Sequence, residues 1–322
     1  MSNKEINLKL ITMSEVEVET VEWLLYPFIP FGKITILEGD PGEGKTTVML
    51  QIIAKLTKGE PVLPSEEKNR EPMKVIYQTA EDGLGDTIKP RLLSAEADCN
   101  NILVIDDADK ALTVSDERLE EAVRLTNAKL IVLDPLQGYL GAEVDMHRAN
   151  EIRPLMHRLS TLADKYKCAV VLIGHMNKSS VGKSNYRGLG SIDIHAAARS
   201  VVLCGRVKDE PEIRVLCQIK SSLAPERTPI AFRLSEEKGF EWIGEYDITA
   251  DELLSGDVRG SKIREATKFL EEFLKDGQKY SKEIEEEANA RGIKKKTLWN
   301  AKNSMNIDSV KVGNRWYWML SE

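Results

Sequence analysis

The sequence predicts an α/β protein in which helices cover both faces of a mostly parallel sheet, followed by a small C-terminal unit. Two observations predict the large part: apolar runs recur with helical patterns between them, and a glycine-rich stretch joins one such run to a helix. A third predicts the small part, because three short helical patterns and a two-residue hairpin turn occupy the last 65 or so residues.

The glycine-rich stretch is a phosphate-binding motif. Lys33 to Leu37 read as a buried strand, Thr46 to Leu56 read as an amphipathic helix, and the residues between them complete the pattern G-x-x-x-x-G-K-[ST]. A turn that only joins a strand to a helix is the alternative. The predicted nucleotide-binding residues are Gly39, Asp40, Pro41, Gly42, Glu43, Gly44, Lys45, Thr46 and Thr47.

The chemistry of this motif points to ATP and Mg²⁺. Backbone amides next to glycines bind phosphate oxygens, and the positive end of the following helix strengthens that binding. Lys45 is expected to reach the β- and γ-phosphates, and the Thr46 hydroxyl to bind Mg²⁺, which prefers oxygen ligands.

Further strands are expected downstream. A helix follows Asn150, where apolar residues recur at helical spacing on one face. The last three strands lack helices between them, which predicts an antiparallel extension of the sheet. The expected strands are 74–79, 101–105, 129–133, 169–174 and 200–205, then 212–219, 229–234 and 239–243.

Polar residues follow three of these strands, where ligands of such sheets bind. Glu81 is a candidate general base for the attacking water, Asp134 a candidate Mg²⁺ partner, and His175 a candidate sensor of the γ-phosphate. Taken alone, each has a simpler interpretation, since acidic residues often cap helices and a lone histidine is usually a bystander.

The succession PFIPFGKITILEGDPGEGKTT, VIYQTAED, LIVLDPLQ, VVLIGHMNKSS and YRGLGSIDIHAAARSVVL resembles the RecA-like ATPases of the RepA type, the hexameric replicative helicases of plasmids, phages and related mobile elements. The resemblance covers residues 20–245. It implies that Lys45 and Thr46 form Walker A, that Glu81 is the catalytic glutamate, that Asp134 is Walker B, and that His175 couples the γ-phosphate to a DNA-facing loop.

The resemblance also implies a ring, with ATP bound between subunits and a cation supplied by the neighbour. Arg199 matches a family arginine that engages phosphate, and Lys220 or Arg227 is a candidate companion. A cation supplied in this way stabilises the transition state and links hydrolysis to subunit contact. A surface arginine in an ordinary salt bridge is the alternative for Arg199.

A predicted loop follows His175. Residues 177–190 are rich in Gly, Ser, Lys and Arg, and in the family such a loop lines the central pore. Lys178, Lys183 and Arg187 are candidates for single-stranded phosphates, and Tyr186 for stacking on a base. A solvated loop without a partner is the alternative.

The C-terminal part is predicted as a winged helix at residues 259–322, after a linker at 246–258. The third helix of this unit is expected to contact DNA, and Arg315 and Trp316 lie on the predicted wing. A protein-interaction domain is the alternative, favoured by the acidic run EIEEEA. The candidate DNA residues of the helix are Lys294, Lys295, Lys296, Thr297, Asn300, Lys302 and Asn303.

Charge is unevenly distributed between the two parts. The net charge of -7 argues against nucleic-acid binding by the whole chain, but from Arg259 onward 14 Lys and Arg face 10 Asp and Glu. The four cysteines are scattered, and neither a signal peptide nor an apolar run of membrane-spanning length is present, so we expect a soluble, cytoplasmic protein. Residues 1–19 form a polar segment, and Trp23 and Tyr26 are expected beside the nucleotide, at a neighbouring subunit or in the core.

These features together predict an ATP-dependent DNA helicase or DNA-translocating ATPase of a replication module, acting as a ring that is expected to be hexameric. Single-stranded DNA and, through the winged helix, double-stranded DNA are the expected partners. Two alternatives stay open: a recombinase or recombination mediator that coats single strands, and an ATP-switched regulator whose winged helix binds a duplex site. The acidic core disfavours the coating protein, which needs a continuous basic groove.

Overall fold

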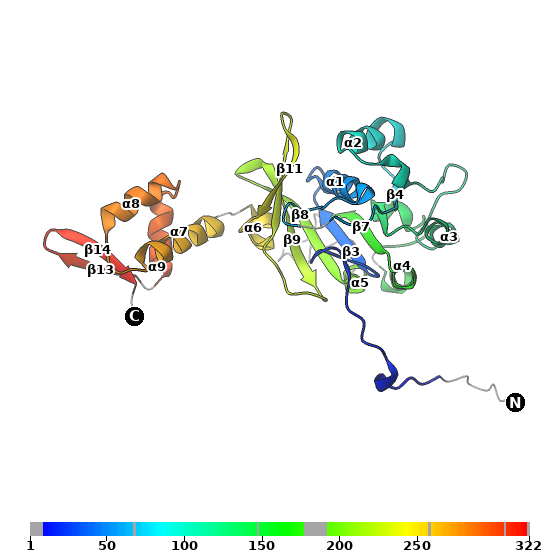
Figure 1. The fold of residues 1–322 in the computed structure, drawn as a ribbon, viewed down its shortest axis with the longest axis horizontal. Coiled ribbons are helices and arrows are strands. Elements are labelled where there is room, and N and C mark those ends of the chain that lie inside the picture. Colours follow the sequence, from blue (N-terminus) through cyan, green and yellow to red (C-terminus); the bar gives the residue numbers. More distant parts are fainter. Residues whose placement is uncertain are drawn as a thin grey trace.

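A nine-stranded sheet forms the centre of the large part of the chain (Figure 1). The computed structural model describes residues 9–66, 69–146, 148–176, 192–256, 259–305 and 307–320. The strand order is β11-β10-β9-β8-β3-β7-β6-β4-β5. The strands are β3 (Ile34–Gly39), β4 (Val75–Thr79), β5 (Ile102–Leu103), β6 (Leu130–Asp134), β7 (Ala169–His175), β8 (Ser200–Val207), β9 (Glu210–Ser221), β10 (Ile230–Ser235) and β11 (Gly239–Glu245).

The sheet is parallel from β8 to β5 and antiparallel from β8 to β11. This confirms the predicted α/β class, including the antiparallel extension. The strands β3, β4, β6 and β7 are mostly apolar because both of their faces are covered. The helices of the large part are α1 (Lys45–Lys58), α2 (Lys89–Ser94), α3 (Glu117–Thr126), α4 (Ala149–Tyr166), α5 (Ile192–Ala197) and α6 (Ala250–Ser255), with short turns η1 (Met13–Glu15), η2 (Leu84–Ile88), η3 (Cys99–Asn101) and η4 (Leu136–Tyr139).

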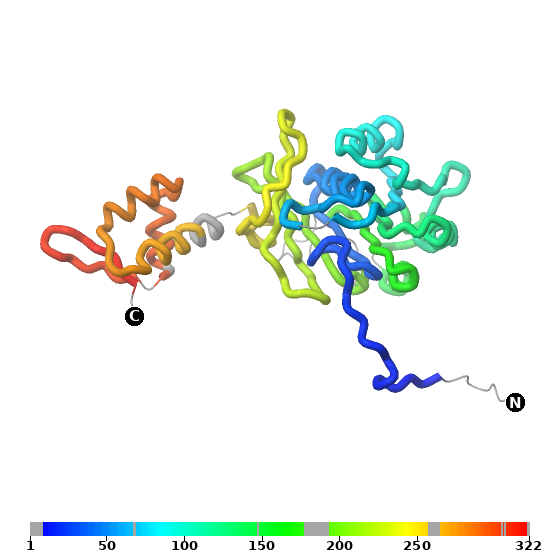
Figure 2. The backbone as a smooth tube through the Cα atoms, viewed as in Figure 1, coloured from blue at the N-terminus to red at the C-terminus, as the bar shows by residue number. Residues whose placement is uncertain are grey.

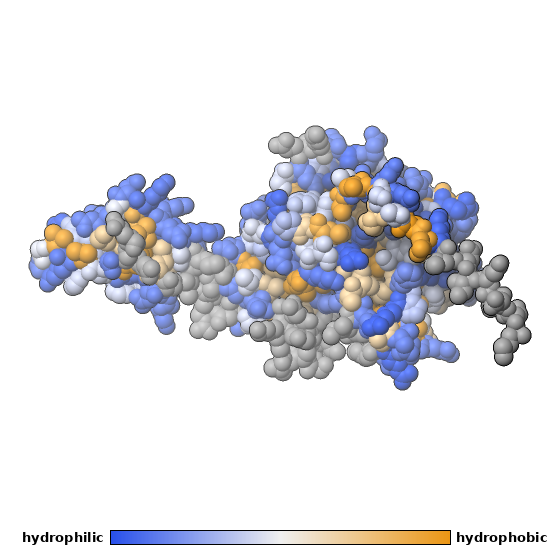
Figure 3. Space-filling view, turned by 90° about the horizontal axis from the view of Figure 1, so that it is seen from below, coloured by the Kyte–Doolittle hydropathy of each residue, from blue (hydrophilic) through white to orange (hydrophobic). Residues whose placement is uncertain are grey.

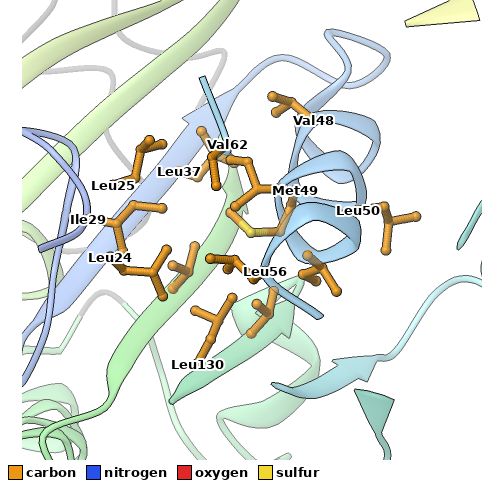
Figure 4. Packing of buried hydrophobic residues seen from close by; sticks show 14 of the residues in the cluster. Leu24, Leu25, Ile29, Leu37, Val48, Met49, Leu50, Leu56, Val62 and Leu130 are labelled. Carbon is orange, nitrogen blue, oxygen red and sulfur yellow. The ribbon is translucent and has the colours of Figure 1, made fainter. Parts of the chain in front are cut away.

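Two hydrophobic clusters lie on the two faces of the sheet. One packs α1 and α2 against the sheet together with the hairpin β1 (Trp23–Leu25) and β2 (Ile29–Pro30). Figure 4 shows this packing, in which Met49 and Leu56 of α1 approach Leu37 and Leu130 of the sheet. The other cluster holds α3, α4 and α5 on the opposite face. Because α1 is held along its length, the loop that precedes it is fixed at the carboxyl end of β3.

Helix α6 lies within the segment that we predicted to be a linker. Its Leu253 is buried with Ile248 against β8 and β9, in a third cluster at the antiparallel end of the sheet. Thr249 begins the helix with a capping box to Glu252. Residues 248–254 therefore extend the core, although their acidic composition resembles that of a linker.

The C-terminal part has a hydrophobic cluster of its own, formed by α7 (Arg259–Leu274), α8 (Ser281–Ala290), α9 (Lys295–Ser304) and Trp318. Three antiparallel strands, β12 (Lys279–Tyr280), β14 (Arg315–Leu320) and β13 (Ile307–Val312), form a sheet in the order β12-β14-β13. The predicted helices and hairpin are present, and β12 is an additional strand. The winged-helix assignment itself stays a prediction.

The position of Lys302 differs from the prediction for the third helix. The sequence pattern placed it among the DNA-contacting residues of the third helix, but its side chain is buried beneath the rings of Trp299 and Trp318. The helix turns this position toward the core because Lys302 follows Leu298 and Ala301, both buried, at helical spacing. Lys302 is thus a packing residue.

In the part of the chain that the structure describes, no helix is long and apolar enough to cross a membrane.

Candidate nucleotide-binding site

Residues 39–44 form a tight loop between β3 and α1. Gly42 and Gly44 have positive φ angles of 80° and 89°, and the helix begins at Lys45 directly after Gly44. Gly39 is required for a different reason, since a Cβ atom there would lie 2.1 Å from the carbonyl oxygen of Cys204 on β8. The loop therefore packs tightly against the neighbouring strand.

The Lys45 side chain curls back into this loop. Its Nζ atom donates hydrogen bonds to the carbonyl oxygens of Gly39 and Asp40, each at 2.9 Å, and lies 3.3 Å from Nδ1 of His175. Burial lowers the pKa of the Lys45 ammonium, an effect opposed by nearby groups that include Asp134. A cation held among backbone groups at a helix N-terminus suits a polyphosphate.

Thr46 and Asp134 form the second pair of the site. The Thr46 hydroxyl donates to Oδ2 of Asp134 at 2.7 Å, and the Tyr77 hydroxyl donates to the same oxygen at 2.9 Å. Burial raises the pKa of the Asp134 carboxyl, while these two hydrogen bonds oppose that shift. These oxygen donors fit Mg²⁺, which binds few protein ligands and takes the rest from phosphates and water.

Glu81 and His175 complete the edge. Glu81 follows β4, and His175 is the last residue of β7. The His175 Nε2 atom lies 3.7 Å from Oε2 of Glu81, whose side chain is 63 % exposed. His175 thus lies between Lys45 on one side and Glu81 on the other. The structure brings together Lys45, Thr46, Glu81, Asp134 and His175 at the carboxyl ends of neighbouring parallel strands.

Three features of the site escaped sequence analysis. In the sequence we interpreted Tyr77 only as part of a strand, although a tyrosine hydroxyl in a buried strand needs a hydrogen-bond partner and is therefore a usable signal. Arg206, near the end of β8, donates to the carbonyl oxygen of Gly42 at 3.2 Å. Beneath the loop, the fully buried carboxylate of Glu38 lies 2.9 Å from Nε2 of His195 on α5, a pairing that only the fold creates.

The three cations proposed to act on a neighbour lie away from this edge. Arg199 precedes β8 at the opposite end of the sheet, where its backbone N–H donates to the Ile34 carbonyl oxygen. Lys220 donates to the carbonyl oxygens of His195 and Ala196. Arg227 lies over the ring of Tyr26. None of the three has a contact with its own phosphate loop among the described residues.

The predicted DNA-binding residues divide into two groups. Lys178, Lys183, Tyr186 and Arg187 lie outside the described residues. Lys294, Lys295, Lys296 and Thr297 lie at the start of α9, where the three lysines are exposed and Lys295 pairs with Glu285 at 3.0 Å. Arg315 is exposed on β14, over the ring of Tyr280.

Comparison with known families accounts for this geometry. Residues 5–181, more than half of the chain, match the family model AAA_25, described as an AAA domain. The chain belongs to this AAA domain family. Its core is a RecA-like P-loop ATPase domain, and the matched range includes the phosphate loop, Glu81, Asp134 and His175.

Two curated relatives resemble part of this AAA domain protein. The DNA repair protein RadA of Listeria monocytogenes is 24 % identical over 149 residues, and that of Escherichia coli is 25 % identical over 150 residues. Each match covers 46 % of this chain and 28 % of the relative, so the chain spans less than a third of the length of these proteins.

Proposed function

We propose that this AAA domain protein is an ATP-dependent DNA helicase or DNA translocase that hydrolyses ATP at the subunit interfaces of a ring. The observation that carries the proposal is the cluster of Lys45, Thr46, Asp134, Glu81 and His175 at one edge of the sheet. A cation, two Mg²⁺-binding oxygens and an exposed carboxylate are the groups that phosphoryl transfer to water requires.

Each side chain has a distinct task in this mechanism. Lys45 exchanges its two carbonyl partners for phosphate oxygens. Thr46 and Asp134 would hold Mg²⁺, which would neutralise charge on the phosphates. Glu81 accepts a proton from the attacking water, which requires hydrogen-bond reach to it. His175, between Lys45 and Glu81, links the γ-phosphate to the segment that follows β7.

The DNA-binding part of the proposal has two sources of support. Both curated relatives are named DNA repair proteins, and the exposed lysines at the start of α9 suit phosphate contacts. We assign residues 20–245, extended by residues 248–254, to the ATPase core and residues 259–322 to a winged helix. Arg199, exposed at the far end of the sheet, is the proposed cation for the ATP of a neighbouring subunit.

A recombination mediator is the second candidate. It is favoured by the partial resemblance to DNA repair protein RadA. A ring helicase separates strands as a closed assembly, whereas a mediator coats single strands as a filament.

The decisive experiment measures ATP turnover with and without single-stranded DNA, together with the assembly mass in ATP. We expect stimulation by DNA and a closed ring. Lys45→Ala should abolish nucleotide binding, whereas Glu81→Gln should retain binding and lower turnover by at least about 100-fold. Glu96→Gln, an exposed position on the same chain, is the matched control. Equal turnover by Glu81→Gln and wild type would show that Glu81 is not the general base. ATP turnover that does not change with single-stranded DNA would contradict the proposed helicase or translocase activity.

A further inference from the structure

Two tryptophans of the C-terminal part are exposed. Trp299 on α9 is 41 % exposed and Trp316 on β14 is 50 % exposed, whereas the other three tryptophans of the chain are buried or half-buried. Figure 2 shows the hairpin of β13 and β14 at the end of the C-terminal part, and Figure 3 shows apolar surface at that end of the molecule. Large aromatic rings left in water on one small unit indicate a binding surface.

The two exposed rings flank a buried one. Trp318 lies two residues beyond Trp316 on β14, so the extended backbone places both side chains on the same side of the strand, with their Cα atoms about 7 Å apart. The Trp299 ring meets the Trp318 ring edge to face, with 5.6 Å between the ring centres. We call Trp299, Trp318 and Trp316 the tryptophan row. Because Trp318 belongs to the core of the C-terminal part, the row is held in place.

Lysine side chains lie at the rings of the tryptophan row. The Lys311 Nζ atom is 5.9 Å from the ring centre of Trp316, its partner across the hairpin. The Lys302 Nζ atom lies between the other two rings, 4.6 Å from the centre of Trp318 and 5.0 Å from that of Trp299. Rings and cations that alternate in this way suit a polymer in which flat bases alternate with charged phosphates.

The elements that carry the tryptophan row are basic. Helix α9 and strands β12, β13 and β14 contain six lysines and arginines but one acidic residue, Asp308 at the base of the hairpin. The six are Lys279, Lys295, Lys296, Lys302, Lys311 and Arg315. Helix α8 is acidic, but Glu285 pairs with Lys295 at 3.0 Å and Glu287 with Arg291 at 3.1 Å. Its other two glutamates are exposed on a helix that carries no part of the row. The charge of the row's own elements therefore favours a polyanion.

The aromatic rings favour unpaired bases over a duplex. In a duplex each base is stacked between its neighbours, so exposing a base face costs the energy of unstacking. In a single strand the bases stack readily on protein rings, whatever their sequence. Tryptophan has a single N–H donor and cannot form the bidentate contacts that read base edges in the major groove.

We propose that the tryptophan row binds single-stranded DNA, with bases stacked on Trp316 and Trp299 and phosphates held by Lys311 and by the lysines that begin α9. Lys295 and Lys296 lie one turn before Trp299, which places them beside its ring on the helix surface. The inference rests on the proposed function and deepens it, because it gives the C-terminal part a contact with the unpaired strand that a helicase produces.

Fluorescence anisotropy of labelled oligothymidylate and of a duplex of equal length tests the proposal on the whole chain. Trp316→Leu keeps an apolar side chain but removes the ring. We expect its affinity for the single strand to fall by about tenfold or more, while its affinity for the duplex stays within about twofold of wild type. Trp316→Phe restores an aromatic ring and should bind the single strand within about threefold of wild type.

The matched control is Val312→Ala, which changes an apolar residue that is 53 % exposed on the other side of the same hairpin. It should bind both DNA forms like wild type. Unchanged single-strand affinity of Trp316→Leu, or equal losses for the single strand and the duplex, would overturn the proposal. So would a Trp316→Phe variant that binds no better than Trp316→Leu, because the ring would then not be the binding group.

Photocrosslinking locates the contact on the unaltered protein. Oligothymidylate that carries one iodouracil should crosslink to peptides containing Trp299 or Trp316, because an excited halogenated base reacts with the ring on which it stacks. Iodouracil paired inside a duplex should give about tenfold less of this product. Crosslinks confined to the ATPase core would overturn the proposal. Both measurements omit ATP, so an inactive ATPase would not change their result, and a negative result would leave the ATPase proposal standing.

Discussion

At the scale of single residues, the Asp134 carboxylate is tightly constrained. It is only 7 % exposed and receives hydrogen bonds from Thr46 and Tyr77 on the same oxygen. Each donor favours the charged form that Mg²⁺ requires, against the effect of burial. Tyr77 is fully buried and its pKa is strongly raised, so it remains a protonated donor at every working pH.

Tyr77→Phe removes that donor and little else. Because groups that orient a metal-binding side chain typically contribute about 10–100-fold, we expect the Mg²⁺ concentration for half-maximal ATP hydrolysis to rise by about tenfold or more. Tyr139→Phe is the control, since Tyr139 is also buried but its hydroxyl has no hydrogen-bond partner within the described residues. Equal Mg²⁺ dependence of the two variants would show that Tyr77 has no influence on the metal.

At the scale of elements, two of the three glycines in the phosphate loop have different requirements. Gly39 needs the absence of a Cβ atom, because the Cys204 carbonyl oxygen occupies that position. Gly42 needs only its positive φ angle, and a Cβ atom there would meet nothing within 4 Å.

Gly39→Ala should therefore be far more damaging than Gly42→Ala. For Gly39→Ala we expect a loss of about 3 kcal/mol in unfolding free energy, since β3 and β8 must separate. For Gly42→Ala we expect about 1–2 kcal/mol, the usual cost of a left-handed backbone at a residue with a side chain. Urea denaturation of both variants measures the difference, and similar midpoints would contradict the close approach of β8.

Helix α3 supplies a pH-dependent element. Asp116 caps its N-terminus and binds the backbone N–H and the guanidinium of Arg118, which hold the pKa of this carboxyl well below its usual range. A lowered pKa means that the folded state favours the charged form. The resulting stability is complete above about pH 4 and is lost as the pH falls through the lower folded value.

Asp116→Asn should lower the unfolding free energy by about 1 kcal/mol at neutral pH. The difference from wild type should stay constant from pH 8 to pH 5 and shrink below about pH 4. The control variant Asp107→Asn changes an exposed neighbour, and its unfolding free energy should match that of wild type across this pH range. Chemical denaturation at each pH measures the unfolding free energy of both variants. If the difference between Asp116→Asn and wild type grew at acid pH, the role of Arg118 would be contradicted.

Local sequence patterns predicted the strands and helices whose apolar residues repeat regularly, such as β6, β7 and α4. They also placed Glu81, Asp134 and His175 after strands, because parallel strands bring their carboxyl ends to one edge. Pairings such as Glu38 with His195 depend on register between distant segments, which no local pattern encodes. The burial of Lys302 was missed because a lysine reads as exposed unless its neighbours on the helix are weighed.

At the scale of the whole molecule, the C-terminal part has a core of its own, and Lys302 belongs to it. The Lys302 ammonium lies 4.6 Å from the ring centre of Trp318 and 5.0 Å from that of Trp299, and it donates to Ser309. Lys294 and Lys296, by contrast, are exposed at the start of α9.

Substitution of Lys302 should therefore affect stability, whereas substitution of Lys294 and Lys296 should affect DNA binding. Lys302→Ala is expected to lower the unfolding free energy by about 2 kcal/mol through lost cation–π contacts and packing. The double variant Lys294→Ala, Lys296→Ala should unfold like wild type but bind duplex DNA more weakly, with the salt-dependence slope reduced by about 2. Thermal unfolding and titrations at several salt concentrations measure these effects. If the double variant bound duplex DNA as tightly as wild type, the proposed contact between α9 and DNA would be contradicted.

The segment 177–191 is bracketed by two anchors on one strand. Just before it, the N–H of Met176 donates to the carbonyl oxygen of Gly39 at 3.4 Å, and just after it, His195 lies 2.9 Å from Glu38. Met176 and His195 thus contact the consecutive β3 residues Gly39 and Glu38. Residues inserted between Met176 and His195 would therefore leave both of these contacts on β3 in place, and we expect such a variant still to bind ATP.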